Sequence, residues 1–212
     1  VTNTQGSITS TCRTSTSSGF SIVSYTGSGA NATVGHGLGV APSLIIGKRR
    51  NGVSNWHVYH AGISNMASGY ITLNTTNAFG TATNTVWNGT APTSTVFSLG
   101  TDTDLNTNGS TNVAYCFAPV SGYSSFGSYT GNGSSDGVFV YTGFRSRWIM
   151  IKRTDVSDSW YIYDTARNTY NIMNLGLYAQ SSSAEQTETA NIFDVLSNGF
   201  KLRGAGGGSN VS

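Results

Sequence analysis

The sequence contains little charge, little proline and almost no cysteine. Only 9% of its 212 residues are charged, three are proline and two are cysteine. Two cysteines cannot build the disulfide framework of a small secreted scaffold. A net charge of +2 is too small to indicate a nucleic-acid partner. No apolar run approaches the roughly 18 residues of a membrane span, so we expect neither a nucleic-acid nor a membrane partner.

Catalytic motifs are equally sparse. The sequence has no Gly-x-Ser-x-Gly elbow, no phosphate-binding Walker loop and no His-Glu-x-x-His. Its three histidines, His36, His57 and His60, are isolated from other catalytic residue types, and an isolated histidine rarely identifies a site. We therefore expect surface or hydrogen-bonded strand histidines, no enzyme activity and no cofactor.

One acidic stretch matches the beginning of a calcium-binding loop. Asp104, Asn106, Asn108 and Gly109 fit the pattern D-x-[DN]-x-[DN]-G. The twelfth position of this loop is Tyr115, where a bidentate glutamate belongs, and no helical pattern flanks it. We expect a turn that connects two strands, and no metal.

Three further aspartates, Asp155, Asp158 and Asp164, surround a predicted hairpin. Glycoside hydrolysis usually needs two carboxylates that flank the scissile bond, and nine acidic residues leave few candidate pairs. Aspartate favours turns because its side chain accepts hydrogen bonds from nearby backbone N–H groups. A role in turns is therefore expected for these three residues.

The sequence is rich in signals for short strands. Apolar runs are repeatedly interrupted by Asn-Gly and Ser-Gly turns, and no long amphipathic helical pattern occurs. This combination predicts an all-β protein, with seven short strands in the first half that suit an antiparallel sandwich. The predicted strands lie near residues 20–25, 43–50, 55–60, 69–74, 84–88, 94–99 and 111–118.

A stretch of the chain recurs 104 residues later. Tyr25-Thr26-Gly27-Ser28-Gly29 returns as Tyr129-Thr130-Gly131-Asn132-Gly133, and no gap is needed from Ser21 to Tyr59. A unit of about a hundred residues that recurs once is too long for a solenoid and suits a duplicated domain. Further identical pairs at this spacing are Val34 and Val138, Gly39 and Gly143, Ile45 and Ile149, Lys48-Arg49 and Lys152-Arg153, Trp56 and Trp160, and Tyr59 and Tyr163.

The repeat predicts two tandem antiparallel β-sandwich modules of jelly-roll type. Residues 1–18 form a polar lead-in strand or linker, 19–120 the first copy and 121–212 the second. The counterpart of the strand at 113–118 would fall beyond residue 212, so we expect the second copy to lack its final strand. Either another chain pairs with the resulting open edge, as in a homotrimer, or the biological chain continues.

The hairpin over 43–60 is the clearest local prediction, because Asn51-Gly52 is a strong turn signal. Alternation places Trp56 and Val58 on one face of its second strand and His57 and Tyr59 on the other. We expect the tryptophan to lie on the core face in both copies.

The opposite faces of the two hairpins offer aromatic rings beside arginines, a combination with which β-sandwich modules hold sugars. The competing interpretation is that the second sheet or another subunit covers these faces, and sandwiches favour it because they bury aromatic residues between sheets. The candidate ligand-binding residues are His57, Tyr59, Tyr161, Tyr163, Arg50 and Arg167.

Cys12 lies in a Ser/Thr tract, and Cys116 lies in the apolar run at 113–118. A disulfide between them is conceivable, but we expect Cys116 to be a buried free thiol that packs as a small hydrophobe.

Several longer motifs resemble a domain of unassigned function that occurs in tail-fibre and other virion proteins of marine phages, particularly those infecting cyanobacteria. The resemblance covers nearly all of residues 7–203 and implies a virion structural or host-recognition role, without established catalytic residues. The motifs include GFSIVSYTG at 19–27, VGHGLGVAP at 34–42, WNGTAPT at 87–93, VAYCFA at 113–118, FGSYTGNG at 126–133 and WIMIKR at 148–153.

Three roles follow as expectations from this resemblance. The first is a virion appendage, such as a tail fibre, that recognises host surface polysaccharide together with other virion proteins. The second is a capsid decoration or head-fibre protein without receptor contact, and the third is a polysaccharide depolymerase, which the shortage of paired acids disfavours. All three place the protein in the virion.

Overall fold

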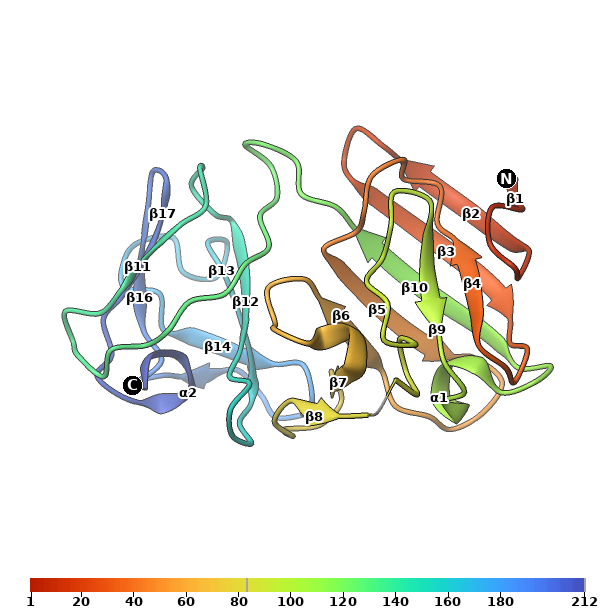
Figure 1. Cartoon of the computed structure of the whole chain (residues 1–212). Helices are drawn as coiled ribbons and strands as arrows, with labels where there is room; N and C mark the ends of the chain where they lie inside the picture. The colour runs from red at the N-terminus through yellow and green to blue at the C-terminus, as the bar shows by residue number, and fades with distance from the viewer. Residues whose placement is uncertain (83, 212) are drawn as a thin grey trace. The chain divides into compact units, whose positions relative to one another are not determined.

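The structure, a computed structural model, describes residues 1–82 and 84–211 (Figure 1). The chain forms two compact units. The first contains residues 1–73 and 79–120, and the second contains residues 74–78 and 121–212. Both units consist mostly of antiparallel β-sheet, as the turn-rich sequence predicts.

An eight-stranded antiparallel sheet forms the base of the first unit. The lead-in before residue 19 contributes its first two strands, and the last strand of the unit, β10, lies between β3 and β5. In spatial order the strands are β1 (Thr2–Asn3), β2 (Ser10–Ser15), β3 (Phe20–Thr26), β10 (Thr111–Phe117), β5 (Leu44–Arg49), β6 (His57–His60), β7 (Gly69–Thr72) and β8 (Gly80–Thr81).

A two-stranded layer, β4 (Ala32–Gly35) with β9 (Val96–Leu99), packs on one face of this sheet. Tyr25 of β3 meets Phe97 of β9 edge to face, with ring centroids 6.1 Å apart. Ser10 Oγ of β2 donates to the Gly35 carbonyl at 2.7 Å. The short helix α1 (Thr103–Asn106) follows β9, and a 3₁₀ turn, η1 (Met66–Ser68), precedes β7. The arrangement is therefore sandwich-like.

The second unit contains two sheets and a short helix, α2 (Gly207–Asn210). Its buried core is centred on Tyr163, Met173, Phe193 and Leu202. One sheet has the order β12 (Trp148–Lys152), β13 (Trp160–Asp164), β14 (Leu175–Tyr178) and β15 (Gln186–Thr187), and the other has the order β11 (Phe139–Tyr141), β17 (Gly199–Leu202) and β16 (Phe193–Leu196).

The predicted strands agree with the structure, apart from small shifts at their ends, at every position but one. Residues 84–88 form a turn rather than a strand. Asn84, Asn88 and Gly89 have φ angles of 69°, 52° and 61°, in the left-handed region that a strand excludes. Strands β4 and β8 were not predicted, because their short sequences Ala-Thr-Val-Gly and Gly-Thr carry little apolar signal.

The predicted core face of the hairpins is only partly right. In β6, Val58 is buried as predicted, but His57 and Tyr59 on the opposite face are buried as well. Tyr161 and Tyr163 of β13 belong to the core of the second unit, whereas Ile162 is only half-buried. A buried tyrosine requires a partner for its hydroxyl, and Tyr163 Oη donates to the Asn191 carbonyl at 2.8 Å. Trp160 is buried as predicted, but Trp56 lies just before β6 and is half-buried.

Both cysteines are buried free thiols, which confirms the expectation for Cys116. Burial raises the pKa of the Cys116 thiol well above its ordinary range, so the group stays protonated and packs as a small apolar side chain. Within the described part of the chain, no helix is long and apolar enough to cross a membrane.

A buried asparagine ties together the loops at one end of each unit. In the first unit, Asn106 Nδ2 donates to the carbonyls of Ala30 and Gly100, both at 2.7 Å. Its Oδ1 accepts the Ser28 N–H at 2.8 Å. One side chain therefore satisfies three backbone groups from two separate loops.

The second unit contains the same arrangement around Asn210. Its Nδ2 donates to the carbonyls of Ser134 and Gly204, both at 2.7 Å, and its Oδ1 accepts the Asn132 N–H at 3.1 Å. The side chain is buried, as is that of Asn106.

Replacing either asparagine with alanine should lower the free energy of unfolding of its own unit by about 3 kcal/mol, because buried backbone groups lose their partners. Thermal and denaturant unfolding of Asn106→Ala and Asn210→Ala would measure this. Asn106→Asp is a second probe: it retains the acceptor for Ser28 but turns a carboxylate oxygen toward the two carbonyls, so it should be at least as destabilising as Asn106→Ala. An alanine variant as stable as the wild type would contradict the assignment.

Candidate functional site

An open pocket of about 400 Å³ lies in the first unit. Its polar lining comes from three places in the chain: the segment before and at the start of β6, the turn at 84–89, and the start of α1. The ring of Tyr70, on β7, also borders it. The lining residues are Asn55, His57, Tyr70, Ala82, Thr85, Val86, Asp102 and Asp104.

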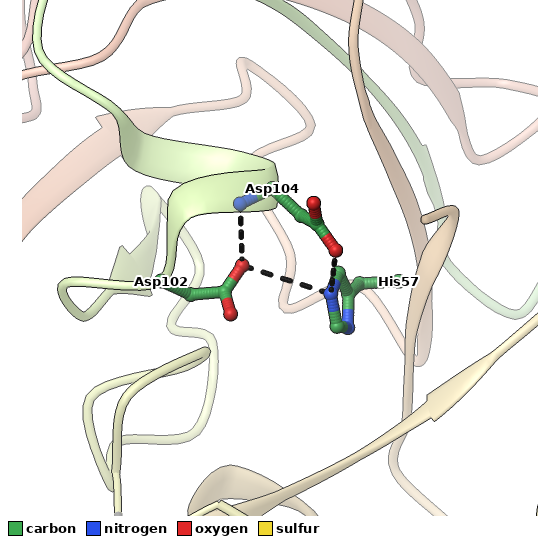
Figure 2. Close-up of side chains that lie close together, drawn as sticks. All are labelled: His57, Asp102 and Asp104. Carbon is green, nitrogen blue, oxygen red and sulfur yellow. Dashed lines mark hydrogen bonds and ion pairs between the residues drawn. The ribbon is translucent and has the colours of Figure 1, made fainter. Parts of the chain in front are cut away.

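His57 points from β6 toward two carboxylates at the start of α1 (Figure 2). Its Nε2 lies 3.1 Å from Asp104 Oδ2 and 3.6 Å from Asp102 Oδ1. Asp102 caps the helix, since its Oδ1 accepts the Asp104 N–H at 2.9 Å. The Tyr70 ring packs edge-on against the imidazole, with centroids 5.4 Å apart. Helix capping therefore brings the two carboxylates to the same histidine.

The hydrogen bonds around Asp104 keep its carboxylate ionised. Burial by itself would raise the pKa of Asp104. The Asn55 side chain, which donates to Asp104 Oδ2 at 2.9 Å, and His57 together outweigh burial and hold this pKa below its usual value. The pocket is therefore acidic at neutral pH.

The His57 imidazole is 3% exposed, and its Nδ1 has no hydrogen-bond partner among the described residues. The neutral tautomer with the proton on Nε2 donates to Asp104 and leaves only an acceptor unpaired. His57, Asp102 and Asp104 each offer one ligand atom, and these atoms lie within 4.8 Å of one another, a spacing that a divalent cation could bridge. In this structure the His57–Asp104 hydrogen bond joins two of these atoms.

Four of the six predicted ligand-binding residues are buried, so they do not form the exposed aromatic platform that the sequence suggested. Tyr59 packs edge-on against Trp87, with ring centroids 5.8 Å apart. Tyr161 and Tyr163 lie in the core of the second unit, and His57, although buried, lines the pocket. The competing interpretation, burial of these aromatic faces, describes the structure.

The two predicted arginines differ in their surroundings. Arg167 is bound to Asp164 Oδ2 at 2.7 Å and to Glu185 Oε2 at 2.6 Å, and it also donates to the Leu175 carbonyl. Its guanidinium therefore links the end of β13 to β14 and to Glu185. Arg50 is exposed and borders a second pocket, of about 220 Å³, whose other lining residues are mostly threonines.

The other two histidines confirm the interpretation of hydrogen-bonded side chains. His36 Nδ1 accepts the Leu38 N–H at 3.2 Å, so its Nε2 donates to the Thr93 carbonyl at 3.1 Å. Burial lowers the pKa of His36, which favours this neutral form. His60 Nδ1 accepts the Gly62 N–H.

The predicted turn role holds for Asp164, whereas the turn predicted at Asp104 is the short helix α1. Asp104 and Asn106 lie within α1 rather than in a calcium loop, and the Asn106 side chain is occupied by backbone groups. Asp164 Oδ1 accepts the N–H groups of Ala166 and Arg167, as in an Asx turn.

Sequence reasoning did not identify Asp102, Asn55 or Tyr70 as neighbours of His57. These residues are separated by up to 47 positions and meet only because β6, β7 and α1 converge. The available signal was local: an aspartate two residues before Asp104, in the position of a helix cap.

Comparison with known proteins gives one match. A family model described as "Domain of unknown function (DUF7483)" matches residues 1–212. No curated protein and no solved structure matches the chain.

The stability of the first unit should depend on acid through Asp104. Because the pKa of Asp104 is lowered in the folded state, its contribution is present above the unfolded value of about 4 and is lost as the pH falls through the folded value. The free energy of unfolding of the wild type should therefore exceed that of Asp104→Asn at pH 6, and this gap should shrink toward pH 2. Denaturant unfolding across this range measures the gap. A gap independent of pH would contradict the prediction.

Proposed function

Since the chain belongs to the DUF7483 family, a domain of unknown function, we propose its role from geometry and from the resemblance to phage virion proteins. The proposed role is that of a non-enzymatic structural module of a virion appendage, such as a tail fibre, that binds host surface polysaccharide. The observation that carries the binding role is the polar pocket beside His57.

The proposal includes an origin of the two units by duplication of one β-sandwich module. Its support is that equivalent contacts recur 104 residues apart. Asn106 and Asn210 make the same three hydrogen bonds. Tyr25 Oη donates to the Leu105 carbonyl at 3.0 Å, and Tyr129 Oη donates to the Ser209 carbonyl at 2.7 Å. These contacts bind the short helix of each unit to segments earlier in that unit, and composition does not explain them.

A compensated change in side-chain volume also supports duplication. Gly47 of β5 lies against Leu105, and a Cβ atom at Gly47 would come within 2.8 Å of Leu105 Cδ2. The residues 104 positions later are Ile151 and Ser209, where the large side chain is on the strand and the small one on the helix. Such an exchange of large and small partners preserves packing within a common framework.

The pocket suits a saccharide because its groups match sugar chemistry. The carboxylates of Asp102 and Asp104 can accept hydrogen bonds from hydroxyl groups, and the Asn55 amide can donate or accept. Tyr70 supplies an aromatic ring at the border. Two ionised carboxylates would repel uronic acids, so we infer a neutral or amino-sugar polymer.

Binding rather than hydrolysis is favoured by the electrostatics of the same carboxylates. A glycosidase needs one carboxylic acid whose pKa is raised, so that it can protonate the leaving group. The pKa of Asp104 is instead lowered by its hydrogen bonds. Asp104 could therefore serve only as the second, ionised carboxylate of such a pair, which makes a depolymerase the weaker candidate.

Glycan-array binding tests the saccharide proposal. Asp104→Asn and Tyr70→Ala should each weaken binding of neutral bacterial polysaccharide about tenfold, because each removes one contact. Asp155→Asn is the matched control, since it removes the same charge at an exposed position in the second unit. Equal affinity of all variants would refute the site, and release of reducing ends would establish the depolymerase.

We also propose that the chain assembles with itself, as a homotrimer, among other virion proteins. Only 9% of its residues are charged, so close packing of copies meets little repulsion. Light scattering of the purified chain should give three times the mass of one chain. A monomer whose mass does not change with concentration would contradict the trimer.

A further inference from the structure

Strand β12 forms an edge of its sheet in the second unit. It pairs with β13, and no other described strand pairs with it. The strand 104 residues earlier, β5, pairs on both sides, with β6 and with β10. The edge that β10 covers in the first unit is therefore open at β12.

The residues that border β10 on its other side, the β3 side, also have counterparts in the second unit. In the first unit, β10 lies between β5 and β3, and its Asn112 pairs with Arg49 on one side and with Tyr25 on the other. The counterpart of Tyr25 is Tyr129. It meets Phe200 edge to face at 6.3 Å, as Tyr25 meets Phe97 at 6.1 Å.

Tyr129 is held in place without belonging to a strand. Its hydroxyl donates to the Ser209 carbonyl. Gly131 lies so close to the backbone that a Cβ atom there would be 2.4 Å from the Val211 carbonyl, as one at Gly27 would be 2.3 Å from the Thr107 carbonyl. Residues 125–132 lie in no strand. The second unit thus has the contacts that hold β3 in place in the first unit, but it lacks the backbone pairing that makes β3 a strand.

We propose that the second unit binds one extended strand from another polypeptide, inserted between β12 and residues 125–130 as β10 is inserted between β5 and β3. The inference rests on the equivalence of the two units and not on saccharide binding. Backbone groups along β12 supply the affinity of such strand addition, and side chains supply the specificity.

The residue pattern of the donor follows from β10. Its core-facing residues Asn112, Ala114 and Cys116 are small and buried, and they alternate with half-buried residues. On β12, Ile149 and Ile151 face the core and remain 8% and 7% exposed, whereas Ile45 of β5 is fully buried. We therefore expect small core-facing side chains in alternation with larger outward ones.

A synthetic peptide of residues 110–118, with Cys116→Ser to prevent disulfides, is the probe. Added to the full chain, it should slow amide hydrogen exchange in Trp148–Lys152 at least tenfold and raise the Tm of the second unit by about 5 °C or more at saturation. Amides of β5, already paired on both sides, serve as the internal control and should not change.

Two peptide variants separate strand insertion from nonspecific binding. Ala114→Lys places a charge at a core-facing position and should abolish protection, whereas Val113→Lys places it at an outward position and should retain it. Absence of protection by the parent peptide, or equal protection by both variants, would overturn the proposal. So would protection of β12 without peptide, because the edge would then be paired by the chain itself or by its copies.

Discussion

The fold depends on neutral side chains that satisfy backbone groups which no strand or helix can reach. Asn106 shows this most clearly, because its buried carboxamide joins two loops and the end of α1 through three hydrogen bonds. With only 9% of the residues charged, such bonds complement the few ion pairs of the chain, such as that of Arg167 with Asp164. They also stabilise a short helix that would not persist alone. Asn210 performs the same task in the second unit.

The pocket beside His57 is a consequence of that same helix. Once Asn106 fixes α1, the cap residue Asp102 and the next helical carboxylate, Asp104, both face β6. The residue 104 positions after His57 is Tyr161, whose hydroxyl donates to Asp158 at 2.8 Å. The residue 104 positions after Asp104 is Gly208, and a Cβ atom there would meet the Asp158 carboxylate at 2.2 Å. In each unit a carboxylate thus lies beside this strand residue, His57 or Tyr161. The carboxylate comes from a different part of the chain in each unit, and only in the first unit does it meet a histidine.

Strand pairing distinguishes the two units more than side-chain packing does. β10 is the last strand of the first unit but lies in the middle of its sheet, so it joins β3 to β5. In the second unit the residues around Tyr129 keep their anchors to α2 without forming a strand. A β-strand requires a neighbour for its backbone, whereas a loop anchored by side chains does not.

The sequence by itself determined the antiparallel β class, six of the ten described strands of the first unit, and the free thiol at Cys116, because alternation and turn residues act locally. Tertiary structure decided which face of each strand is buried. Tyr161 and Tyr163 are in the core because their hydroxyls reach Asp158 and the Asn191 carbonyl, partners brought there by the fold. Tertiary structure also formed the pocket beside His57. Its lining residues are far apart in the sequence, so no local sequence pattern predicts that they meet.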